Sequence, residues 1–154
     1  MYQHIMVPMD GSKLAECVLP HVEKVAGGGN PVKVTLVRVV PPFHLHDYAE
    51  AKLQPKEQKQ LEERAKENAS KYLDKIVKRL TRKGIEAEAV VLFGNVVPTL
   101  VDYTGKNGVE LIVISTHGRS SISQLIFGSV AENILRYSCV PVLMVRAPGC
   151  VINL

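Results

Sequence analysis

Short apolar runs alternate along the chain with stretches whose apolar residues recur at helical spacing. The runs predict β-strands at residues 4–7, 32–40, 85–93, 111–114 and 140–145. The stretches between them predict helices from Ser12 to the glycines at 27–29, at 55–83, around Pro98 and at 129–137. Strands that alternate with helices predict an α/β fold, an open five-stranded parallel sheet with helices on both faces.

Two helices carry features that the structure can test. Pro20 lies inside the first predicted helix, where a proline should kink the axis. The long helix at 55–83 has an apolar stripe that we expect to be buried. The stripe consists of Leu61, Ala65, Ala69, Tyr72, Leu73, Ile76 and Leu80.

The stretch from Leu111 to Val130 is the best candidate for chemistry. It passes from a buried strand through a segment with Gly118 and Gly128 to the start of a helix at Ser129. The free N–H groups and partial positive charge of a helix N-terminus favour an anion such as phosphate. Glycine and serine are also ordinary residues of turns and helix caps, so a plain strand–loop–helix junction is the alternative. Neither G-x-x-x-x-G-K-[ST] nor G-x-G-x-x-G after a strand is present.

The first strand ends in a second polar segment, which contains Asp10, Gly11 and Ser12. Parallel sheets bind ligands beyond the carboxyl ends of their strands, where the strand order reverses. If the first strand is central and the fourth lies beside it, Asp10 and the segment from Ser115 to Gly118 face one crevice. A carboxylate at one side and glycine N–H groups at the other suit a nucleotide.

Length and composition narrow the class of protein further. A chain of 154 residues predicts one domain, for which we expect residues 1–146, followed by a tail at 147–154. The apolar runs are too short and interrupted for a membrane span, and no signal peptide is visible, so we expect a cytoplasmic protein with no membrane partner. The net charge of +4 favours an anionic ligand, but the cations are mixed with acids and aromatic residues are few, which argues against nucleic acid.

Metal and thiol chemistry are not expected. His44, His46 and Asp47 share one loop and offer metal-ligand atoms, but such a set on a loop is more typical of ordinary polar residues, and we expect no metal there. Cysteines at 17, 139 and 150 have no metal-binding spacing and should be reduced thiols.

Several segments together resemble the universal stress protein (UspA-like) family over essentially the whole chain. The family signature G-x-x-G, nine residues, G-[ST] has its counterpart in Ser115-Thr116-His117-Gly118, nine residues, Gly128-Ser129. The segments IMVPMDGS, LIFGSVAENIL and CVPVLMV resemble the first strand and its turn, the loop and its helix, and the last strand.

The resemblance implies a Rossmann-like sheet of order 3-2-1-4-5 that holds ATP, with Mg²⁺ carried by the phosphates. It also implies homodimers that pair through the last strand, from Val140 to Val145, which would otherwise be an exposed apolar edge. Adenosine is expected at Pro8, Met9, Asp10 and Val39, and the ribose and phosphates at Ile114, Ser115, His117, Gly118, Arg119, Gly128, Ser129 and Val130.

One position departs from the signature, because Ser115 replaces its first glycine. A serine would hinder the site if the backbone there needs a positive φ, and would fit if the backbone is extended. Three functions follow. ATP binding in stress response or signalling ranks first, a dimeric interaction module without nucleotide second, and slow ATP hydrolysis last. Only His117 and Asp10 are candidates for a base, so we expect no catalytic residue and at most weak ATPase activity.

Overall fold

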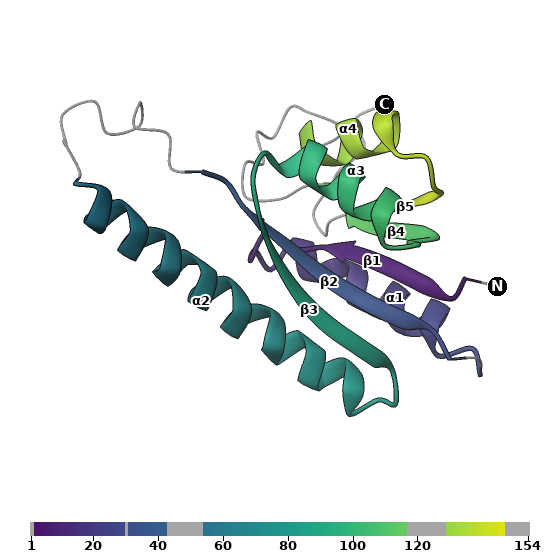
Figure 1. Cartoon of the computed structure of the whole chain (residues 1–154). Helices are drawn as coiled ribbons and strands as arrows, with labels where there is room; N and C mark the ends of the chain where they lie inside the picture. Colours follow the sequence, from purple (N-terminus) through teal and green to yellow (C-terminus); the bar gives the residue numbers. More distant parts are fainter. Residues whose placement is uncertain (1, 30, 43–53, 117–128, 147–154) are drawn as a thin grey trace, which may run out of the picture.

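A computed structural model describes residues 2–29, 31–42, 54–116 and 129–146. Its centre is a five-stranded sheet of order β3-β2-β1-β4-β5 (Figure 1). All four neighbouring pairs are parallel, which confirms the predicted architecture and strand order. The strands are β1 (His4–Pro8), β2 (Lys33–Val40), β3 (Glu86–Phe93), β4 (Leu111–Ser115) and β5 (Val142–Val145).

Helices cover both faces of the sheet, and each face has its own apolar core (Figure 1). A short 3-10 helix η1 (Ala15–Val18), helix α1 (Leu19–Ala26) and helix α2 (Pro55–Thr81) pack on one face. Helices α3 (Val96–Lys106) and α4 (Ser129–Tyr137) pack on the other. Alternate residues of β1 show the division, because Ile5 and Val7 belong to the first core and Met6 to the second.

The predicted kink at Pro20 is wrong. The segment divides into η1 and α1, and Pro20 lies in the first turn of α1. Proline is tolerated there because the first N–H groups of a helix have no partner within the helix. The Oγ of Ser12 accepts a hydrogen bond from the N–H of Ala15, the first residue of η1, at 3.1 Å.

The buried stripe predicted for the long helix is only half confirmed. Ala69, Leu73, Ile76 and Leu80 are buried, but no residue in the first half of α2, at 55–68, is buried. Figure 1 shows the reason: this half of α2 extends away from the sheet. Helical periodicity therefore continues beyond the surface that covers it.

The last strand begins two residues later than predicted, at Val142. Pro141 has no N–H to donate, although its carbonyl accepts a hydrogen bond from the N–H of Ile112 at 3.0 Å. Within the described ranges, no helix has the length and apolar content needed to cross a membrane.

Candidate functional site

The site predicted from the sequence lies where the order of the strands reverses. From β1 the chain continues to β2 and β3 on one side, whereas β4 and β5 lie on the other. Strands β1 and β4 are parallel neighbours, so their carboxyl ends meet at one edge of the sheet. Such a reversal leaves a crevice beyond the strand ends, because the connections leave toward opposite faces.

The β1 side of this edge is a tight polar turn. Pro8 ends β1, and the N–H of Met9, a buried residue, donates to the carbonyl of Val37 at 2.8 Å. The backbone N–H and the Oγ of Ser12 both donate to Oδ1 of Asp10, at 2.8 and 2.6 Å. These bonds hold the carboxylate of Asp10 in a fixed position at the strand end.

Gly11, at the centre of this turn, has a backbone conformation that favours glycine, with φ at +85°. The guanidinium of Arg38 lies directly beside it. A Cβ atom at position 11 would stand 2.6 Å from Nη1 of Arg38. The turn is therefore built on the side chain of a residue from β2.

The neighbouring residue of β2 faces the opposite side of the sheet. Val39, predicted to meet adenine, is partly buried and packs against the core beneath α3 and α4. Because successive strand residues point to opposite faces, Arg38 lies on the side of α1 and α2.

The β4 side of the edge is buried. Ile114, Ser115 and Thr116 are buried, and the N–H of Thr116 donates to the carbonyl of Val145 at 2.9 Å. Ser115 belongs to β4, and no non-glycine residue in the described ranges has a positive φ. Of the two alternatives for Ser115, the structure therefore shows the extended backbone, in which a serine fits.

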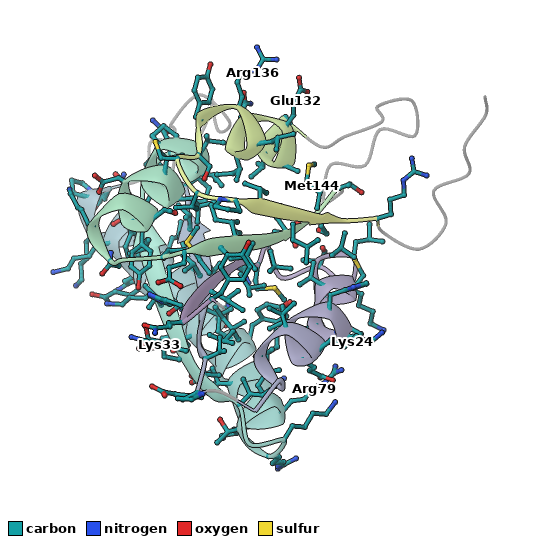
Figure 2. All side chains as sticks on the ribbon, turned by 90° about the vertical axis from the view of Figure 1, so that its right-hand side faces the viewer. Lys24, Lys33, Arg79, Glu132, Arg136 and Met144 are labelled. Atoms are coloured by element: carbon teal, nitrogen blue, oxygen red, sulfur yellow. The ribbon has the colours of Figure 1, made fainter. Side chains whose placement is uncertain are left out.

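Helix α4 begins with the other predicted residues of this site. Ser129 is its first residue, and its carbonyl accepts a hydrogen bond from Nδ2 of Asn133 at 2.8 Å. Val130 is partly buried against the core that also contains Ile114. Glu132 and Arg136 project from the outer side of α4, joined at 3.2 Å (Figure 2). Four predicted residues lie outside the described ranges, namely His117, Gly118, Arg119 and Gly128.

The loop considered for a metal, with His44, His46 and Asp47, also lies outside the described ranges. Within those ranges, no three side chains of the types His, Cys, Asp and Glu gather into a possible metal site.

Sequence reasoning missed the support behind the turn. Tyr72 of α2 lies against Arg38, whose Cζ is 5.7 Å from the centroid of the tyrosine ring. The hydroxyl of Tyr72 donates to Oε1 of Glu16 at 3.3 Å. Burial raises the pKa of Tyr72 above its usual value, and the negative charges of Glu16 and Asp10 add to the effect, so the hydroxyl stays protonated. The one available signal was the cation at position 38 in the otherwise apolar end of the strand, LVRVV.

A parallel sheet whose strand order reverses, with a polar turn at the point of reversal, is typical of Rossmann-like α/β proteins. The model of the universal stress protein family matches residues 1–146, and the chain belongs to that family.

Individual relatives agree with this assignment. The universal stress protein MJ0577 of Methanocaldococcus jannaschii is 25% identical, over 95% of this chain and 96% of its own. A solved structure of MJ0577 has a TM-score of 0.83 at 26% identity, over 97% of this chain and 99% of its own.

Two more distant structures share the fold and were solved with nucleotides. A family member from Arabidopsis thaliana with AMP bound has a TM-score of 0.69 at 14% identity, over 96% of this chain and 93% of its own. A universal stress protein in complex with cAMP has a TM-score of 0.64 at 23% identity, over 94% of this chain and 97% of its own.

Proposed function

We propose that this chain is a cytoplasmic universal stress protein that binds ATP at the carboxyl ends of β1 and β4, and that it acts in stress response or signalling as a homodimer. The observation that carries the proposal is the strand reversal. It brings the Asp10 turn and the end of β4 to one edge, from which the chain continues into the signature segment. Relatives of the same fold that hold AMP and cAMP support an adenine nucleotide.

The residues at this edge suit the two ends of such a ligand. The fixed carboxylate of Asp10 offers acceptor capacity to ribose hydroxyls or an adenine amino group, and Val39 offers an apolar surface to the base. The N-terminus of α4 at Ser129, with the glycines that precede it in the sequence, suits the phosphates. Mg²⁺ would be held by the phosphates, and the functional domain would comprise residues 1–146.

The proposal is binding without efficient hydrolysis, and of the two candidate bases only Asp10 lies within the described ranges. A general base needs a free lone pair directed at the attacking water. Oδ1 of Asp10 instead accepts two hydrogen bonds from Ser12, an arrangement that holds the carboxylate as an orienting group.

Dimerisation is proposed through β5, which ends the order of the sheet. The side chains of Leu143 and of Leu135 and Tyr137 in α4 are large, apolar and exposed. Met144 lies on the same strand, which faces the viewer in Figure 2. A short edge strand with exposed apolar side chains pairs readily with a second copy.

Nucleotide binding is tested on protein purified without added nucleotide. Mass spectrometry of the denatured sample and ATP titration calorimetry should give about one ATP or ADP per chain. Gly118→Val and Gly128→Val should abolish binding while the melting temperature of the free protein changes little. Gly105→Val is the matched control, because nothing lies within 4 Å of a Cβ at that position of α3.

Two results would contradict the nucleotide proposal. An empty protein that gives no heat with Mg²⁺ and ATP would favour the interaction module without nucleotide. Unchanged affinity in both glycine variants would remove the signature segment from the site. Steady release of phosphate from ATP by the wild type, lost in the same variants, would instead establish the hydrolase.

The dimer is tested by Leu143→Asp, which places a charge on the exposed face of β5. Sedimentation analysis should show a shift from dimer to monomer, because the carboxylate would have to be buried without a partner. Lys106→Asp, at an exposed position of α3, is the control and should remain dimeric. A dimeric L143D protein would place the interface elsewhere.

A further inference from the structure

Arg38 is the cation on which the turn after β1 rests. Nη1, Cζ and Nη2 of its guanidinium lie 2.6, 3.1 and 3.3 Å from the point where a Cβ of Gly11 would stand. A planar group this close to a residue without a side chain packs directly against the backbone of the turn. The shape of the turn and the position of Arg38 are therefore coupled.

Arg38 also contacts α2. The ring of Tyr72 lies 5.7 Å from Cζ, within the range of a cation–π contact. The Tyr72 hydroxyl is in turn tied to Glu16 of η1 at 3.3 Å. The guanidinium thus contacts both the turn and a side chain that is itself held by a hydrogen bond.

Charge reinforces this packing. Asp10 and Glu16 are both close enough to act on Tyr72, and both raise its pKa, whereas Arg38 lowers it. Two carboxylates and one guanidinium therefore share this corner of the molecule, where partial burial weakens the screening by water. Removing the cation would leave the carboxylates with less compensation and the turn without its backing.

We propose that Arg38 is a positioning residue of the nucleotide site: it holds the Asp10–Gly11–Ser12 turn in the conformation that meets the nucleoside end of the ligand. The proposal rests on the proposed nucleotide binding. Arg38 itself contacts no ligand in this scheme. It lowers the cost of binding because the turn is already ordered before the ligand arrives.

The test compares Arg38→Met, Arg38→Lys and the control Lys33→Met. Lys33 is a cation at the other end of the same strand, paired with Glu88 at 2.9 Å. Affinities for ATP and for adenosine are measured by calorimetry. The exchange rate of the Ser12 amide hydrogen is measured by NMR without nucleotide, because this hydrogen bonds to Asp10.

We expect R38M to weaken ATP and adenosine binding by the same factor, on the order of tenfold, because the turn serves the part that the two compounds share. The Ser12 amide should exchange faster in R38M. R38K should show both effects to a smaller degree, and it replaces R38M if the methionine variant does not fold. K33M should change neither property.

Three outcomes would overturn the inference. Unchanged affinities and unchanged Ser12 exchange in R38M, with a wild type that binds ATP, would refute it and leave the nucleotide site intact. A loss confined to ATP would make Arg38 a phosphate ligand. A wild type that binds neither compound would refute the proposed function, and the Ser12 exchange would then still decide whether Arg38 holds the turn.

Discussion

Both ends of the sheet carry hydrogen-bonded polar side chains. At the amino end the partners are far apart in the sequence, and at the carboxyl end Asp10 and Ser12 are close together in it. At the amino end, His4 of β1 contacts Thr35 of β2 at 2.8 Å, and the hydroxyl of Thr35 donates to Glu88 of β3 at 2.8 Å. At the carboxyl end, Asp10 accepts two hydrogen bonds from Ser12, which is only two residues further along the chain. These bonds link three strands at the amino end, whereas the bonds between Ser12 and Asp10 shape a turn at the carboxyl end.

Helix α3 and a lysine complete the network of the amino end. Nδ1 of His4 lies 3.1 Å from the carbonyl of Asn107, the residue that follows α3. Lys33 pairs with Glu88 at 2.9 Å. Such a network, which joins three strands and the end of a helix, stabilises the domain.

The comparison is tested most strongly at Thr35, which is fully buried. Thr35→Val keeps the shape but leaves His4 and Glu88 without their shared partner. This should lower the free energy of unfolding by about 1–3 kcal/mol. Nucleotide affinity should stay the same, because the change lies at the other end of the sheet. Urea unfolding and calorimetry measure the two quantities.

Thr104→Val is the matched control, since Thr104 is also buried but its hydroxyl donates at 2.8 Å to the carbonyl of Leu100 in its own helix. Thr104→Val should lower the free energy of unfolding by less than Thr35→Val does. An equal cost at both positions would mean that the network adds nothing beyond an ordinary buried hydroxyl.

Two glycines give the next comparison. Gly11 and Gly84 have similar positive φ values, +85° and +78°, but a Cβ at Gly84 would have nothing within 4 Å. Alanine should therefore strain the backbone by about 1–2 kcal/mol at either position. Only G11A should also weaken ATP binding, because only there does the new methyl group displace Arg38. Equal ATP affinities in G11A and G84A would show that the contact between Gly11 and Arg38 does not affect nucleotide binding.

The sequence was sufficient to predict the sheet and its reversal because both depend on local patterns. Each strand is a short and largely apolar run, and Asp10 lies two residues after the first strand ends at Pro8. Arg38 could not be found in this way. Its neighbours, Gly11 and Tyr72, lie 27 residues before it and 34 after it in the sequence, and only the folded chain brings them together.

The long helix shows a second limit of pattern reasoning. Leu61 and Ala65 continue the stripe of Leu73 and Leu80, yet only the latter pair is buried. Periodicity records which face of a helix is apolar, but it does not record how far the covering surface extends. Pro20 shows a similar limit, because the apolar pattern did not reveal that a new helix begins at Leu19, directly before the proline.

The smallest expected effect concerns acid at the amino end. Partial burial alone would raise the pKa of Glu88, but hydrogen bonds from Lys33 and Thr35 outweigh it and lower the pKa below its usual value. A lowered pKa in the folded state stabilises the fold above the ordinary carboxyl pKa and ceases to do so as the pH falls through the lowered value.

Glu88→Gln should therefore reduce stability at neutral pH by less than about 1 kcal/mol, because the pair with Lys33 is exposed to water. The difference from the wild type should shrink as the pH falls below the ordinary carboxyl range. Thermal unfolding across a pH series measures it. Glu110→Gln, whose carboxylate accepts from the N–H of Gln3 at the same end of the sheet, is the control for a carboxylate that has no lysine partner among the described residues. A difference that is independent of pH would show that Glu88 acts through its shape alone, and that the charge of this network contributes nothing to holding the three strands together.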